Sequence, residues 1–250
     1  MFREAIKQLL PGSAIALWRA SRDSFRLRSI GVEPMIGSNC TYLGTPYGGY
    51  AVPIDALDPQ SVCLCFGAGE DISFEIELAR RFACTVDVLD PTPRSIRYVR
   101  DTVEGLASSE AALASLLRFH PWGIWSEDTT LRFYAPTSSE HVSHSIVNMQ
   151  GTKEYFEAEC VCPKTLLTTL GATSVDLIKL NIEGAEYEVL AAFEAAEIHP
   201  RIICLNFDEM HSPIDRFARY RMREQMEKLT ALGYRVVNAD TAKITLERAR

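Results

Sequence analysis

The sequence predicts a doubly wound α/β fold in which helices cover both faces of a seven-stranded, mostly parallel sheet. From Ser61 onward, apolar runs of strand length alternate with helical patterns, which is typical of parallel strands joined by crossover helices. The first run ends in a turn with two glycines, and the second ends in Asp90. Sheets of this kind hold nucleotide-like ligands at such strand ends. The length of 250 residues suits one domain of this class.

An N-terminal arm precedes this alternation. Residues 1–58 hold a short amphipathic segment and then a turn-rich stretch from Gly37 to Tyr50, and neither continues the strand and helix pattern. We therefore divide the chain into a helical and turn-rich arm over residues 1–58 and a main domain over residues 59–250.

Apolar periodicity places the elements of the main domain in order. Thr92-Pro93 predicts a helix start, because Thr can cap a helix and Pro suits the first helical position. The insert 127–148 does not fit a plain crossover, and the run 130–134 predicts an extra strand in a hairpin near the active-site edge. The expected strands cover 62–66, 85–89, 117–125, 175–180, 202–207, 234–238 and 242–246, and the expected helices 73–82, 94–103, 111–116, 163–170, 185–195 and 213–232.

The turn after the first strand reads Phe66-Gly67-Ala68-Gly69-Glu70-Asp71. Its two glycines allow a tight turn and a close backbone approach to a ligand, although an ordinary strand-to-helix turn is the alternative. The third glycine of the dinucleotide motif is absent, and the two acidic residues would repel a pyrophosphate. S-adenosylmethionine (SAM) has no phosphate and carries two cationic groups, so the loop favours SAM over a nicotinamide or flavin dinucleotide.

Asp90 stands 23 positions after Gly67, close to the spacing of about 20 at which an acidic residue reaches ribose hydroxyls. The alternative interpretation is a polar residue that starts the turn Pro91-Thr92-Pro93. Trp125, at the end of the third expected strand, is a candidate for bordering the adenine, unless it packs on the inserted hairpin.

Three stretches carry a resemblance to a known family: CFGAGEDISF at 65–74, LDPTPRS at 89–95 and IKLNIEGAE at 178–186. In this order, over about 120 residues, they resemble the FkbM-type SAM-dependent methyltransferases. The resemblance implies a Rossmann-like class I methyltransferase fold and an O-methyl transfer onto a hydroxyl of a small polar metabolite or sugar. The expected cofactor-binding residues are Phe66, Gly67, Ala68, Gly69, Asp71, Asp90, Pro91 and Trp125.

One departure from the family pattern concerns catalysis. The family motif K-x-D-x-E-G has Asn181 in place of its Asp, and an amide cannot accept a proton as a base does. We expect Glu183 to act as base with Asn181 orienting the acceptor, and His211 is a further candidate. A helix cap is the alternative for Glu183, and a surface position for His211. If Asn181 abolishes turnover, the protein binds SAM without transferring methyl groups.

Composition limits the partners. The net charge of −7 argues against broad nucleic-acid binding, and no apolar run reaches the 18 residues of a membrane span. Cys63/Cys65 and Cys160/Cys162 are C-x-C pairs, which lack the usual zinc spacing, so no metal site is expected. The residues therefore favour a cytoplasmic enzyme with a small-molecule acceptor.

Overall fold

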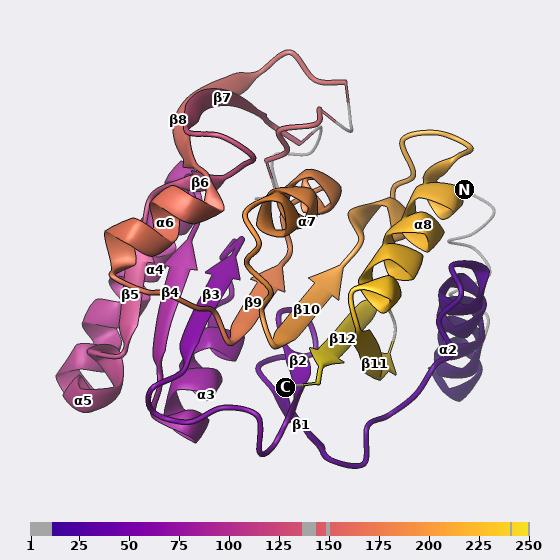
Figure 1. Cartoon of the computed structure of the whole chain (residues 1–250), viewed down its shortest axis with the longest axis horizontal. Coiled ribbons are helices and arrows are strands. Elements are labelled where there is room, and N and C mark those ends of the chain that lie inside the picture. The colour runs from indigo at the N-terminus through magenta and orange to yellow at the C-terminus, as the bar shows by residue number, and fades with distance from the viewer. Residues whose placement is uncertain (1–11, 137–143, 149–150, 241, 250) are drawn as a thin grey trace.

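The structure, a computed structural model, describes residues 12–136, 144–148, 151–240 and 242–249. A seven-stranded sheet forms its centre, in the order β11-β12-β10-β9-β3-β4-β5 (Figure 1). Strand β12 is antiparallel to both of its neighbours, while the β10-β9, β9-β3, β3-β4 and β4-β5 pairs are parallel. The strands are β3 (Val62–Phe66), β4 (Thr85–Leu89), β5 (Leu117–His120), β9 (Leu177–Leu180), β10 (Ile202–Asn206), β11 (Tyr234–Asp240) and β12 (Lys243–Arg248). The predicted doubly wound sheet is confirmed.

Helices cover both faces of this sheet (Figure 1). Because side chains alternate across a strand, β3 directs Leu64 and Phe66 into one apolar core and Cys63 and Cys65 into the other. The first core packs against α6, α7 and α8, and the second against α3 and α4. These helices are α3 (Ser73–Phe82), α4 (Pro93–Ser109), α6 (Pro163–Leu170), α7 (Glu186–Ala195) and α8 (Ala218–Ala231), and a short α5 (Ala111–Ala114) follows α4.

The expected strand over 117–125 is wrong, because the run divides between two sheets. Strand β5 ends at His120, and β6 (Gly123–Ile124) joins a separate three-stranded sheet. Pro121 lies at the break and has no N–H to donate to a continuing ladder. The small sheet has the order β6-β8-β7, in which β7 (Thr129–Tyr134) contains the extra strand that the sequence predicted, paired with β8 (Tyr155–Val161).

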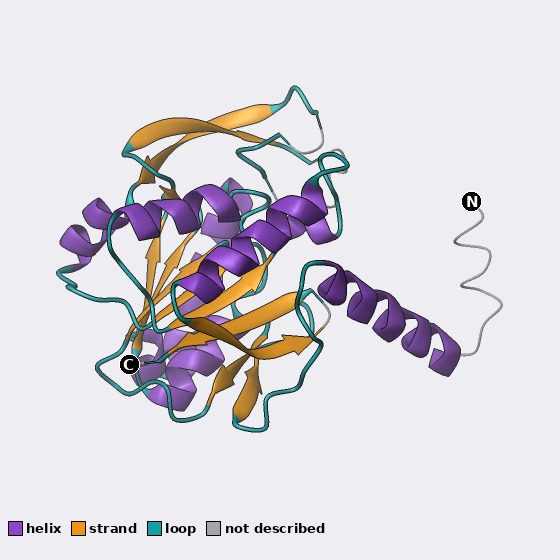
Figure 2. Ribbon diagram, turned by 45° about the vertical axis from the view of Figure 1, so that its right-hand side comes forward, coloured by secondary structure: helices purple, strands orange, loops and turns teal. Residues whose placement is uncertain are grey.

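Residues 12–58 form a helix and a hairpin outside the seven-stranded sheet. Helix α2 (Gly12–Ser29) lies beside the α8 end of the molecule, and β1 (Cys40–Leu43) pairs with β2 (Tyr50–Pro53) (Figure 2). Thr245 of β12 donates to the Ala51 carbonyl at 2.7 Å, which ties the hairpin to the sheet. Among the described residues, no helix combines the length and the apolar character that a bilayer crossing requires.

Candidate functional site

A pocket of about 250 Å³ lies at the carboxyl ends of β3, β4 and β9. From β3 the sheet continues through β4 and β5 on one side and through β9 and β10 on the other. The order of the strands therefore reverses at β3. Open α/β sheets bind ligands beside such a reversal. The loops after these three strands supply much of the pocket wall. The hairpin turn before β2, the small three-stranded sheet and the segment 144–146 also line it.

The loop after β3 depends on Gly67. Its φ of +85° is a left-handed conformation, and a Cβ there would lie 1.9 Å from the Asn181 carbonyl oxygen. Gly69 also has a positive φ, of +55°, but a Cβ at that position would meet no atom within 4 Å. Gly67 therefore lets the β3 and β9 loops touch, and Gly69 leaves space on the pocket side.

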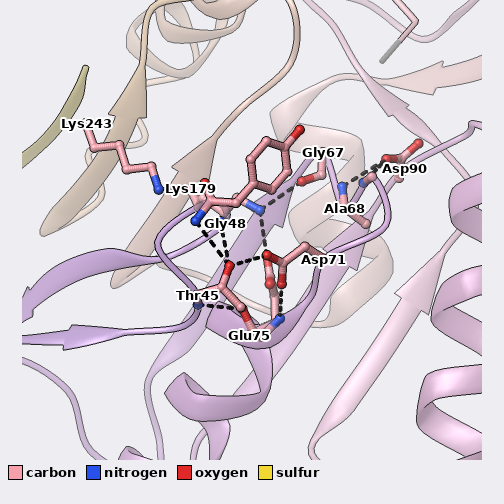
Figure 3. A network of polar contacts seen from close by, with 12 residues as sticks. Thr45, Gly48, Gly67, Ala68, Asp71, Glu75, Asp90, Lys179 and Lys243 are labelled. Atoms are coloured by element: carbon pink, nitrogen blue, oxygen red, sulfur yellow. Dashed lines mark hydrogen bonds and ion pairs between the residues drawn. The ribbon is translucent and has the colours of Figure 1, made fainter. Parts of the chain in front are cut away.

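A buried ion pair between Lys179 and Glu75 contacts this loop at the Gly67 carbonyl. The Lys179 ammonium on β9 donates to Glu75 at 2.7 Å and to the Gly67 carbonyl at 2.8 Å (Figure 3). Burial alone would lower the pKa of Lys179, but the neighbouring Glu75 carboxylate outweighs it and raises the pKa. Sequence reasoning assigned no role to either residue, although a lysine inside an apolar strand signals a buried partner.

Asp90, at the end of β4, accepts hydrogen bonds from the same loop. One carboxylate oxygen accepts from the backbone N–H groups of Ala68 at 2.9 Å and Gly69 at 3.0 Å. The other accepts from the Thr92 N–H at 2.8 Å. A carboxylate offers about four lone-pair positions, so these three bonds leave capacity for a ligand hydroxyl.

Asp71 connects the loop to the N-terminal hairpin (Figure 3). It accepts from the Thr45 hydroxyl at 2.5 Å and from the Ser73 N–H at 2.9 Å. Burial alone would raise the pKa of Asp71, but the hydrogen bonds from Ser73 and Thr45 lower it, so the group is ionised at neutral pH. Glu70 forms a two-point ion pair with Arg94, so on the side of the β3 loop the carboxylates that line the pocket without such a pair are Asp71 and Asp90.

The hairpin turn closes one side of the pocket, where Tyr47 and Gly48 line it. Lys243 of β12 donates to the carbonyls of Pro46 at 2.9 Å and Tyr47 at 2.6 Å. Burial and the nearby Lys179 charge lower the pKa of Lys243 to about 8. Sequence reasoning named this turn-rich stretch only as part of an arm, because nothing local to it shows which strand ends it meets.

The loop after β9 brings Asn181 and Glu183 to the pocket. The Asn206 amide of β10 donates to the Asn181 side-chain oxygen at 3.0 Å, which leaves the Asn181 NH₂ group as the donor available to a ligand. Glu183 has a φ of +54°, and its carbonyl accepts from the Ser145 hydroxyl at 2.6 Å. A residue other than glycine in this conformation stores local strain, which is common at functional sites.

Two buried carboxyl groups support that loop. Glu186 accepts from the backbone N–H of Ile182 at 3.3 Å and of Gly184 at 3.1 Å. Burial raises the pKa of Glu186 to about 7, and burial together with Glu186 and Glu183 raises the pKa of Asp208. Glu186 and Asp208 each have a buried oxygen that no donor in the described structure reaches, so we infer that a proton held by this pair near neutral pH supplies the missing donor.

The structure gathers most of the predicted site residues but not all of them. Trp125 lies outside the pocket, although Gly123 and Ile124 just before it line the wall; Trp122, stacked on His120 at 5.1 Å, lines the pocket instead. His211 lies in a different pocket, beside Arg26. The predicted residues that line the main pocket are Phe66, Gly67, Ala68, Gly69, Asp71, Asp90, Pro91, Asn181 and Glu183.

Residues 57–236 match the model of one protein family, described as the methyltransferase FkbM domain. This match spans the pocket loops after β3, β4 and β9 and excludes the N-terminal hairpin. No curated protein matches the chain in sequence.

Solved structures with a similar fold include several methyltransferases. A methyltransferase FkbM from Methylobacillus flagellatus KT is 14% identical with a TM-score of 0.49, and the alignment covers 76% of this chain and 44% of that one. An rRNA methylase from Streptococcus thermophilus is 10% identical with a TM-score of 0.42, covering 79% and 92%. A Streptococcus mutans protein solved with SAH, the demethylated product of SAM, is 7% identical with a TM-score of 0.42, covering 77% and 90%. This chain thus spans less than half the length of the Methylobacillus protein.

Proposed function

The chain belongs to the FkbM methyltransferase family, and from this we propose that it transfers the methyl group of SAM to a hydroxyl oxygen of a small polar metabolite or sugar. SAM is the methyl donor of the class. The observation that supports the proposal most directly is the open glycine loop at the sheet reversal, bordered by carboxylates from β4 and from the loop itself.

The residues of the pocket fit SAM better than a dinucleotide. Asp71 and Asp90 supply negative charge for the ammonium and sulfonium groups and acceptors for the ribose hydroxyls. The buried Lys179 is occupied by Glu75 and the Gly67 carbonyl, so it does not form a phosphate clamp. We assign cofactor contacts to Phe66, Gly67, Ala68, Gly69, Asp71, Asp90 and Pro91, and we add Trp122 beside the adenine.

Glu183, which lines the pocket, is the base that we propose. SAM would supply the methyl group and leave as SAH, and the Glu183 carboxylate would take the proton of the acceptor hydroxyl as its oxygen is methylated. The Asn181 NH₂ group, oriented by Asn206, donates to the acceptor oxygen and aligns it. The acidic chain, with a net charge of −7, supports a small-molecule acceptor over a nucleic acid.

A second candidate function follows from Asn181. Its amide takes no proton, and its oxygen is already occupied by Asn206, so the site can bind SAM without turnover if Glu183 does not reach the acceptor. Both functions require the cofactor pocket, and they differ only in methyl transfer.

Calorimetric titration with SAH tests the cofactor assignment. We expect saturable one-to-one binding by the wild type and at least about tenfold weaker binding by Asp90→Asn, because the loop N–H groups lose an ionised acceptor. Asp101→Asn, which removes an exposed carboxylate on α4, is the matched control and should bind as the wild type does. Absence of SAH binding by the folded wild type would refute the proposal.

Transfer of a labelled methyl group from SAM to a panel of sugars and polyols separates the two functions. Turnover that Glu183→Gln lowers by about 10²- to 10⁴-fold, with SAH affinity unchanged, supports the methyltransferase. SAH binding by the wild type without transfer to any acceptor in the panel, together with transfer by Asn181→Asp, supports the binding protein.

A further inference from the structure

A second pocket, of about 160 Å³, lies where α2 meets α8 and the turn after β10. It shares no lining residue with the SAM pocket. Its floor is apolar and buried, formed by Met210 and Met222, which are 6% and 2% exposed. Its polar wall contains Arg26 from α2, His211 from the turn and Arg219 from α8. We call it the α2–α8 pocket.

Positive charge accumulates at this pocket in a chain whose net charge is −7. Partial burial and the neighbouring charges of Arg22 and Arg219 lower the pKa of Arg26. Asp23 offsets part of this charge, since it accepts from Arg22 at 3.0 Å and from Arg26 at 3.4 Å. Within the described part of the chain no carboxylate pairs with Arg219, whose guanidinium lies 5.4 Å from the Phe25 ring centre.

The one further carboxylate that lines the pocket is already engaged. Glu209 accepts from the Tyr187 hydroxyl at 2.8 Å, and Arg221 forms a two-point ion pair with it. Arg221 and Tyr187 together lower the pKa of Glu209 against the effect of its burial, so its charge is compensated by Arg221. The α2–α8 pocket therefore keeps an excess of cationic donors.

His211 adds a neutral donor. Its Nδ1 lies 3.4 Å from the Arg26 guanidinium, which can only donate, so Nδ1 must accept and the ring proton sits on Nε2. Partial burial and the Arg26 charge lower the pKa of His211, so this neutral form prevails at pH 7. The ring thus offers an N–H group to a ligand without adding to the repulsion.

We propose that the α2–α8 pocket binds a phosphate-type oxyanion carried by a small ligand, as a second site separate from methyl transfer. Guanidinium groups recognise phosphate and carboxylate by paired hydrogen bonds, and an anion between Arg26 and Arg219 removes their mutual repulsion. The apolar floor of Met210 and Met222 accommodates an apolar group attached to the anion.

Calorimetric titration with inorganic phosphate, at constant ionic strength set by chloride, tests the site in the whole chain. We expect one phosphate per wild-type chain, an unchanged affinity when SAH is present, and at least about tenfold weaker binding by Arg219→Gln and Arg26→Gln. Arg223→Gln removes an exposed positive charge one turn further along α8 and is the matched control. Melting temperatures confirm that each variant is folded.

Three results would overturn the proposal: no saturable phosphate binding by the wild type, an equal loss in Arg223→Gln, or competition by SAH. A second readout is the NMR signal of the His211 ring, which should shift with phosphate in the wild type and not in Arg219→Gln. Titration with acetate distinguishes the anion, because a phosphate site binds acetate more weakly, whereas equal or tighter acetate binding would reassign it to a carboxylate ligand.

Discussion

The loops after β3 and β9 border the same pocket, but different chemistry holds them in place. The β3 loop is held by the Lys179–Glu75 ion pair and by the Asp90 carboxylate. The β9 loop is held by Glu186, whose burial raises its pKa to about 7, and lies beside Asp208, whose pKa is also raised by burial. The side proposed to hold the acceptor is therefore the side that we expect to respond to pH near neutrality.

Breaking the Lys179–Glu75 pair should have the largest effect. Lys179→Met leaves the fully buried Glu75 carboxylate without its cation, which we expect to lower the free energy of unfolding by about 3 to 5 kcal/mol. Urea denaturation measures this loss. The double variant Lys179→Met/Glu75→Leu should recover most of the stability, since two apolar side chains replace the pair.

The double variant also separates stability from positioning. It lacks the bond from the Lys179 ammonium to the Gly67 carbonyl, so its SAH affinity should stay below that of the wild type even when its stability recovers. A double variant that binds SAH normally would show that Lys179 serves stability alone.

The two loop glycines should differ in their tolerance of alanine. Gly67→Ala places a Cβ against the Asn181 carbonyl, so both loops must move, and we expect a loss of more than about 2 kcal/mol and of measurable SAH binding. Gly69→Ala meets open space and should cost only about 1 kcal/mol for its positive φ. Thermal denaturation with and without SAH compares them, and equal costs would contradict the contact between the loops.

The contribution of Glu186, which supports the β9 loop, to the free energy of unfolding should depend on pH. The pKa of Glu186 is raised from 4.5 to about 7 in the folded protein, so folding takes up a proton and stability falls as pH rises through that window. Glu186→Gln keeps the oxygen that accepts from Ile182 and Gly184 and removes the titration. Relative to this variant, the wild type should lose about 2 kcal/mol between pH 5 and pH 8.

Denaturation curves over this pH range measure the difference. Glu188→Gln, two residues further along α7 and exposed, is the control and should follow the wild type. If Glu186→Gln and the wild type fall in parallel, the shared proton is not on this pair.

Sequence patterns predicted the parts of the site that are local in the chain. The runs 62–66 and 85–89 form strands with the predicted bounds, and the glycine loop and Asp90 meet because parallel neighbours end at one edge of a sheet. Asn181 and Glu183 reach the same pocket for the same reason.

The parts that sequence reasoning missed depend on contacts between distant segments. Glu75 on α3 and Lys179 on β9 are 104 positions apart in the sequence. The packing of α3 against the sheet brings them together. Tyr47 lies outside the segment that matches the family and meets the pocket because Lys243 holds its turn. His211 follows a sheet strand, as a catalytic residue would, yet its turn directs it toward α2.

The smallest predicted effect concerns the joint between the hairpin and the cofactor loop. Thr45→Val removes the hydroxyl that donates to Asp71 and should lower the free energy of unfolding by no more than about 1 kcal/mol, because the joint is near the surface. The hydroxyl helps to lower the pKa of Asp71, so its contribution is present at neutral pH and is lost as pH falls through that depressed pKa. The difference between wild type and variant should therefore be largest near pH 7 and vanish in acid, as urea denaturation at several pH values would measure. Thr169→Val, which removes a hydroxyl that donates to the Thr165 carbonyl within α6, should show no such trend. A pH-independent difference for Thr45→Val would mean that the hairpin is held to the loop by packing and not by the Asp71 charge.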